Sequence, residues 1–168
     1  MENVGALKKE KISAIGQFLL ILGGLMVVPM FPNQLFSGPL VNALLFIVTV
    51  FLGLRSGIIL SFVPSLMALF GGLLPAIMAP FIPFIIISNI IMVVLFHYVR
   101  RKNYWLGVGA GGVVKFLFLT VSIQLYFQLF LNKPITQAIV TMMSWNQLYS
   151  ALMGGVIAFV FLKFVKRI

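Results

Sequence analysis

Two long stretches without a charged side chain dominate the first hundred residues, one from Ile12 to Leu54 and the other from Ser56 to Val99. A transmembrane helix needs about 20 predominantly apolar residues, so each stretch is about twice the required length. Clusters of proline and glycine, which interrupt helices, lie near the middle of each stretch. These breakers are Pro29, Pro32, Gly38 and Pro39 in the first stretch, and Gly71, Gly72, Pro75, Pro80 and Pro83 in the second. Each stretch therefore predicts a helical hairpin that crosses a membrane and returns.

The remaining residues predict a third pair of spans, separated by the polar, proline-containing segment 132–134. The six predicted spans cover approximately residues 12–30, 39–54, 57–72, 83–100, 104–131 and 147–165. Pro64 lies inside the third span, where we expect a kink. Residues 135–145 are expected to form a short helix along the membrane surface. The pattern thus predicts an all-α membrane protein in which residues 1–168 form a single domain, a six-transmembrane-helix bundle.

Composition supports the same class. Of the 168 residues, 62% are hydrophobic and only 8% are charged, and the mean hydropathy is +1.18. Soluble domains carry about 25% charged residues, and a soluble fold of this size could not bury so much apolar surface. The net charge of +10 would suit a nucleic-acid partner. The basic residues, however, are clustered between the predicted spans, so we expect a lipid bilayer as partner and no nucleic acid.

The positions of the basic residues predict the orientation in the membrane. With an even number of spans the two termini share one side, and basic residues favour the cytoplasmic side. The basic residues on the side of the termini are Lys8, Lys9, Lys11, Arg55, Arg100, Arg101, Lys102, Lys163, Lys166 and Arg167, against Lys133 alone on the opposite side. Both termini are therefore predicted to be cytoplasmic.

Few side chains are available for catalysis. The sequence has two acidic residues, Glu2 and Glu10, one histidine, His97, and no cysteine. A carboxylate pair, a metal-ligand cluster or a thiolate site therefore cannot be built within the predicted spans, and the sequence lacks a phosphate-binding P-loop. We accordingly expect neither an enzyme nor a bound cofactor or metal.

Uncharged polar side chains near the outer half of the bundle are the candidates for ligand binding. Thr120, Gln124 and Gln128 are spaced by four residues and share one helix face. Because polar groups in hydrocarbon are costly unless they are paired, we expect this stripe to face the bundle. It either bonds neighbouring helices or contacts a ligand. The same two alternatives apply to Asn42 and Asn89, within spans two and four.

The start of the last span combines amide groups with aromatic rings, in Trp145, Asn146, Gln147 and Tyr149. Such a set suits an aromatic or heterocyclic ligand that is held by stacking and by amide hydrogen bonds. Trp and Tyr are also common at membrane interfaces, which is the alternative interpretation of these two rings.

Lys115 is the one charged residue inside a predicted span. Nine residues separate it from Gln124, which places the two side chains on opposite sides of an ideal helix. We therefore expect Lys115 and the glutamines to face different surfaces. For Lys115 we prefer a structural or coupling role over contact with a substrate.

Small residues gather in the last two spans, where they allow helix backbones to approach closely. They are Gly107, Gly109, Ala110, Gly111 and Gly112 in span five, and Ala151, Gly154, Gly155 and Ala158 in span six. The predicted outer connections, residues 30–38, 73–83 and 131–146, are long and carry few charges. Together with the six spans and these apolar outer loops, the segments 107–119 (GVGAGGVVKFLFL) and 146–158 (NQLYSALMGGVIA) resemble the substrate-binding S component of energy-coupling factor (ECF) type ABC transporters. The resemblance covers roughly the whole chain.

The resemblance implies a high-affinity binding subunit for a vitamin-like small-molecule substrate in the multi-pass plasma membrane of a prokaryote. It implies a pocket open to the outside, and docking to a transmembrane coupling subunit that carries two cytoplasmic ATPase subunits. In this family the first helix commonly docks through an alanine-x-x-x-alanine motif. The nearest residues here are Ser13, Ala14 and Gly16, at a different spacing.

Two other functions fit the sequence. A structural or assembly membrane protein would use the polar stripe and the small-residue faces for helix packing alone. A small passive channel or carrier would also fit, although the lack of acidic residues within the spans argues against ion-coupled transport.

Overall fold

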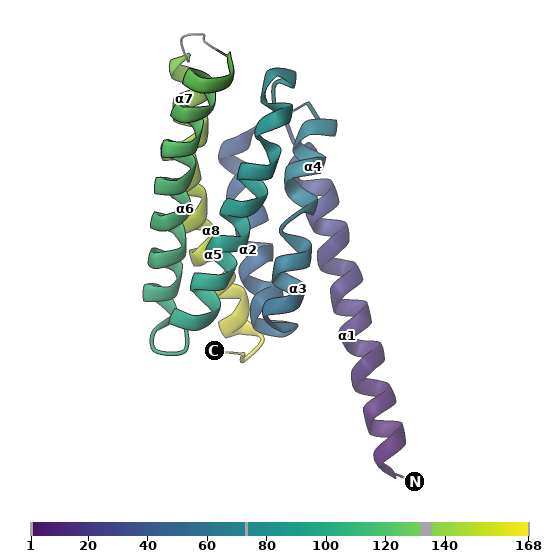
Figure 1. Ribbon diagram of the computed structural model, residues 1–168. Helices are drawn as coiled ribbons and strands as arrows, with labels where there is room; N and C mark the ends of the chain where they lie inside the picture. Colours follow the sequence, from purple (N-terminus) through teal and green to yellow (C-terminus); the bar gives the residue numbers. More distant parts are fainter. Residues whose placement is uncertain (1, 73, 132–135, 168) are drawn as a thin grey trace.

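The computed structural model describes residues 2–72, 74–131 and 136–167, and within them every regular element is helical (Figure 1). The α-helices are α1 (Glu2–Val27), α2 (Gln34–Phe51), α3 (Gly53–Leu60), α4 (Val63–Phe70), α5 (Ile82–Val99), α6 (Tyr104–Tyr126), α7 (Gln137–Met143) and α8 (Trp145–Phe164). Two 3₁₀ turns, η1 (Val28–Met30) and η2 (Ala76–Phe81), follow α1 and precede α5, and a π-helical turn, η3 (Phe127–Leu131), extends α6.

Six helical segments among the described residues are long and apolar enough to cross a membrane. They are Ile12–Met30, Gln34–Phe51, Gly53–Phe70, Ala76–Val99, Tyr104–Leu129 and Gln137–Phe164. The prediction of an all-α membrane protein with six transmembrane helices is confirmed.

The two ends of the bundle differ in what they carry (Figure 1). Both chain termini lie at one end, which we call the terminal end, and α7 and the connection from α4 to α5 lie at the opposite end, which we call the far end. In the bundle α8 packs along α2, and α6 packs against both α5 and α8. The first helix, α1, packs against α4 and α2 and extends past the other helices at the terminal end.

The connection between α1 and α2 is shorter than predicted, because α2 begins at Gln34. The Asn33 side chain caps this helix by accepting a hydrogen bond from the Leu35 N–H at 3.0 Å, which defines where the helix starts. Gly38 and Pro39 therefore lie inside α2, and their assignment to a turn is wrong. A proline is tolerated within a membrane helix where neighbouring groups compensate for its missing N–H.

The kink predicted at Pro64 is a complete break between two short helices. Helix α3 ends at Leu60, and Pro64 lies in the first turn of α4, where its missing N–H removes no helical hydrogen bond. The next connection, between Phe70 and Ala76, falls at the predicted breakers. Gly72 there has a φ of +74°, which glycine adopts without steric strain.

The last part of the chain also differs in detail from the prediction. Helix α7 is shorter than the surface helix predicted over residues 135–145, and α8 begins at Trp145, before the predicted start at residue 147. The predicted break between spans five and six falls on residues 132–134, which lie outside the described residues.

Two apolar clusters fill the bundle. The cluster nearer the terminal end contains Phe46 and Phe96, whose ring centroids are 4.5 Å apart, together with Leu162. The cluster nearer the far end contains Phe81 and Tyr126, whose ring centroids are 5.5 Å apart. Burial of such large side chains is the main source of packing contacts within the bundle.

Several helices approach each other closely at glycines, and at two of these the facing group is a backbone carbonyl. A Cβ atom at Gly111 of α6 would lie 2.8 Å from the Met92 carbonyl oxygen of α5. A Cβ atom at Gly154 of α8 would lie 2.7 Å from the Pro39 carbonyl oxygen of α2. Only glycine permits contacts this close between helix backbones. The contact at Gly111 fixes how α6 is rotated about its axis, and hence which of its side chains face the interior.

Candidate functional site

A cavity of about 70 Å³ lies in the half of the bundle that is nearer the far end. Half of its lining residues are polar, although the bundle as a whole is apolar. The lining residues are Pro29, Gln34, Ser37, Gly38, Val41, Asn42, Pro64, Ser65, Ala68, Leu74, Ile85, Asn89, Lys115, Met143, Gln147 and Ser150. The cavity is therefore built where α2, α4, α5, α6 and α8 meet.

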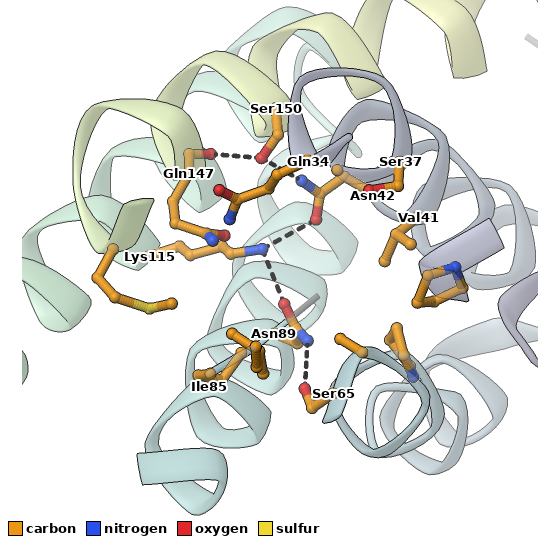
Figure 2. Close-up of a pocket in the computed structure, with 16 residues that line it drawn as sticks. Gln34, Ser37, Val41, Asn42, Ser65, Ile85, Asn89, Lys115, Gln147 and Ser150 are labelled. Carbon is orange, nitrogen blue, oxygen red and sulfur yellow. Dashed lines mark hydrogen bonds between the residues drawn. The ribbon is translucent and has the colours of Figure 1, made fainter. Parts of the chain in front are cut away.

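Lys115 is the central polar residue of this cavity, and only 2% of its surface is exposed. Its Nζ donates hydrogen bonds to Asn42 Oδ1 at 2.9 Å and to Asn89 Oδ1 at 2.8 Å (Figure 2). The two asparagines belong to α2 and α5, so the amino group of Lys115 joins three helices.

Further hydrogen bonds turn both amide oxygens toward Lys115. Asn42 Nδ2 donates to Ser150 Oγ at 2.9 Å, and Asn89 Nδ2 donates to Ser65 Oγ at 3.4 Å (Figure 2). With its NH₂ group used in this way, each amide presents its acceptor oxygen to the amino group. An ammonium has three N–H donors and no acceptor, so the two amide oxygens leave one donor of a protonated Lys115 unused.

The described side chains provide no anion to balance this lysine. Both acidic residues of the sequence, Glu2 and Glu10, belong to the N-terminal part of α1, which leaves the bundle at the terminal end (Figure 1). The hydrogen-bond partners of Lys115 are neutral amides. An ionisable group inside a membrane is costly, and by default it marks a functional site.

Three amide side chains form hydrogen bonds on the far-end side of the cavity. Asn146 Nδ2 donates to Gln34 Oε1 at 3.2 Å. Gln34 Nε2 and Gln147 Nε2 each donate to the Met142 carbonyl oxygen at 3.3 Å. These bonds join α2 to α7 and α8, and their lengths are at or beyond the long end of the usual range for N–H···O bonds. The contacts on this side of the cavity are therefore weak.

Comparison with known proteins bears on what the cavity serves. A sequence-family model described as "ECF transporter, substrate-specific component" matches residues 17–165. The chain belongs to this family. It is therefore an S component, the membrane subunit that gives an ECF transporter of prokaryotes its substrate specificity, and the family is not an enzyme class. No curated protein and no solved structure matches the chain.

Membership in the family also implies partners for the S component. These are a small-molecule substrate, a coupling subunit and ATPase subunits. The resemblance inferred from residues 107–119 and 146–158 is confirmed.

Some of the residues predicted to bind substrate lie at the cavity of the S component. Asn89 and Gln147 line it. Asn146 does not line it, but it is hydrogen-bonded to the lining residue Gln34. The structure therefore brings together residues from spans two, four and six.

The other predicted residues lie away from the cavity. Gln124 and Gln128 are exposed on the outside of the described chain, so the expectation that their stripe faces the bundle is wrong. Thr120 is half-buried and donates to a carbonyl one turn earlier in its own helix at 2.8 Å. Trp145 and Tyr149 are 65% and 45% exposed, respectively.

The rotation of α6 explains this outcome. The contact at Gly111 turns toward the interior the residues that follow at intervals of four, namely Lys115, Leu119 and Ile123, and all of these are buried. Gln124 then falls on the opposite side of the helix. The expectation that Lys115 and Gln124 face different surfaces is confirmed.

Sequence reasoning missed part of the site. It preferred a structural or coupling role for Lys115, and it did not single out Gln34 or Ser150. A signal was nevertheless present, because a lysine in the middle of a span requires polar partners at similar depth. Asn42 and Asn89 are the asparagines that lie well inside other spans, and they are the partners that the structure shows.

A second concave surface lies on the outside of the bundle, between α1, α2 and α8. This groove has a volume of about 390 Å³ and is lined by Ser13, Gly16, Gln17, Leu20, Ile21, Leu44, Ile47, Phe51 and Phe161. Two of the three predicted docking residues, Ser13 and Gly16, therefore border one apolar groove. Ala14 is half-buried and does not line it.

Proposed function

We propose that this S component captures a vitamin-like micronutrient outside the cell, in the cavity around Lys115, with high affinity. The solute is then delivered through a coupling subunit that separate ATPases drive. The observation that carries this proposal is the hydrogen-bonded polar centre of Lys115, Asn42 and Asn89, which borders a cavity in an otherwise apolar bundle.

The position of the cavity supports uptake rather than export. It lies in the half of the bundle away from both termini. The distribution of basic residues predicts that the termini are cytoplasmic, which would place the closed end of the cavity at the outer surface. A tag at either terminus should then react with an impermeant reagent only after the cells are broken.

Binding requires the far end to open, because about 70 Å³ is much less than the roughly 300–1,000 Å³ of typical ligand sites. The hydrogen bonds of Gln34, Asn146 and Gln147 are long and lie on the far-end side of the cavity. Movement of α7 together with the start of α8 would separate these side chains from α2. A solute could then replace amide bonds that are already long.

The groove beside α1 supports docking of the coupling subunit. Most of its lining residues are apolar, and it lies between α1, α2 and α8. Small residues at Ser13, Ala14 and Gly16 leave room for another helix to approach the backbone of α1. Docking there would leave the cavity between α2, α5 and α6 free.

Native mass spectrometry of the gently purified S component, followed by denaturing extraction, tests the proposed function. We expect a stoichiometric small molecule in the wild-type protein and little of it in Asn42→Ala or Gln147→Ala. Lys163→Ala, a change at an exposed residue near the terminal end, serves as the control and should retain the compound. A protein without ligand that no vitamin stabilises in a thermal-shift screen would contradict the proposal.

A further inference from the structure

We propose that the solute is a monoanion whose carboxylate contacts the Nζ of Lys115, an inference that rests on the proposed function. The starting observation is geometric. Two of the three N–H donors of an ammonium are used by Asn42 and Asn89. Because Lys115 also lines the cavity, its third donor is available to a ligand that enters there.

The charge of the site points to an anion. Lys115 is the one charged residue among those that line the cavity, and its polar partners from the described chain are neutral. Removing a charge from water is unfavourable unless an opposite charge or strong hydrogen bonds replace the solvent. A ligand carboxylate would supply the opposite charge and a charge-assisted hydrogen bond at the same time.

The number of charges favours a carboxylate over a phosphate. One lysine balances one negative charge, whereas a phosphate monoester carries nearly two at neutral pH. Phosphate sites commonly use arginine forks or a helix N-terminus as further positive groups. The cavity lining contains no arginine among the described residues. A carboxylate therefore leaves the occupied site neutral, which suits its position inside a membrane.

Neighbouring amides can serve the second carboxylate oxygen. Gln147 lines the cavity, and its Nε2 now donates to the Met142 carbonyl oxygen at 3.3 Å. An amide held by so long a bond can turn to a stronger acceptor at little cost. The small free volume next to Lys115 fits the compact anionic end of a solute, and the remainder would occupy the space that opens toward Gln34.

The test compares matched pairs of compounds that differ only in the negative charge. Nicotinate, pantothenate, biotin and lipoate are each titrated beside the corresponding primary amide, using the full chain in lipid nanodiscs. We expect at least one carboxylate to bind, and its amide to bind roughly 10- to 100-fold more weakly. Lys115→Met should weaken binding of the carboxylate by a similar factor and remove the preference for the anion.

A second variant distinguishes loss of the carboxylate contact from a folding defect. Asn89→Asp keeps the size of the side chain and places an internal carboxylate within hydrogen-bonding distance of Nζ. The folded variant should therefore reject the carboxylate ligands, because their position opposite Lys115 is already neutralised. Asn103→Asp makes the same chemical change at the exposed cap of α6 and should bind like the wild type, as should Lys163→Met.

The outcomes separate this inference from the proposed function. Equal affinity for a carboxylate and its amide, or unchanged affinity in folded Lys115→Met, would overturn the carboxylate contact and leave solute binding intact. Binding of none of the carboxylates would overturn it as well. The proposed function is contradicted only if, in addition, native mass spectrometry finds no compound in the purified protein.

Discussion

Polar residues lie on two opposite sides of α6 and of its extension η3, and they are used in different ways. On the interior side, Lys115 is 2% exposed and bonded to amide oxygens of α2 and α5. On the outward side, Gln124 and Gln128 are exposed. The interior side includes the close contact of Gly111 with α5. A Cβ atom added at Gly109, which falls outside that contact, would meet no neighbouring atom within 4 Å.

The difference shows that spacing and environment are separate pieces of information. Residues four apart share a helix face, but spacing alone does not say whether the face meets another helix. In α6 the close contact of Gly111 with the α5 backbone determines which face of the helix is buried. The face that contains Gly111 meets α5 closely enough for Lys115 to reach Asn89.

The glycines of α6 should respond very differently to the same substitution. Gly111→Leu would force side-chain atoms against the Met92 carbonyl oxygen, and we expect the free energy of unfolding to fall by about 3 kcal/mol. Gly109→Leu has open space and should stay close to the wild type. Thermal unfolding in detergent measures both. Similar losses at the two positions would refute the assignment of the interior face.

Removal of the Asn89 amide oxygen should destabilise the protein, because Lys115 then loses a hydrogen-bond acceptor. Asn89→Leu conserves volume and deletes an acceptor of Lys115, and loss of a hydrogen bond to a charged group costs about 2 kcal/mol. In a Lys115→Met background the same change should cost much less, because no ammonium remains to be satisfied. The midpoints of chemical or thermal unfolding of the four proteins give the coupling. Simple additivity would contradict the network.

The smallest effects are expected on the outward side. Gln124→Leu and Gln128→Leu alter exposed side chains and should shift Tm by less than about 2 °C. Solute affinity in these variants should equal that of the wild type by titration. Loss of solute binding in either variant would instead indicate that Gln124 and Gln128 belong to the binding site, as the sequence pattern suggested.

The number and type of elements could be predicted from the sequence because the bilayer imposes a length on each span. Charge-free stretches and proline clusters sufficed for six helices. Their ends were harder to predict. Pro39 continues α2 because Asn33 caps the helix further upstream, whereas Pro64 interrupts a span because the chain restarts there as α4. Whether a proline ends a helix therefore depends on the residues around it, and the proline alone does not predict it.

The site was predicted only in part for a related reason. Asn89 and Gln147 were identified as polar residues within or at the start of spans, and both line the cavity. The convergence of Asn42, Asn89 and Lys115 depends on how three helices are rotated. That rotation follows from contacts between glycine and a facing backbone, whose partners are distant in the sequence.

The buried lysine also has a consequence for the way the protein enters the membrane during synthesis. Lys115 lies near the middle of its span, where insertion of a lysine costs about 2.5–3.5 kcal/mol, and each Leu, Ile, Phe or Val contributes only about 0.3–0.6 kcal/mol in favour. Asn42 and Asn89 belong to spans that leave the ribosome earlier. Both acceptors are therefore in place when the lysine arrives, and chain order itself lowers the cost of inserting it.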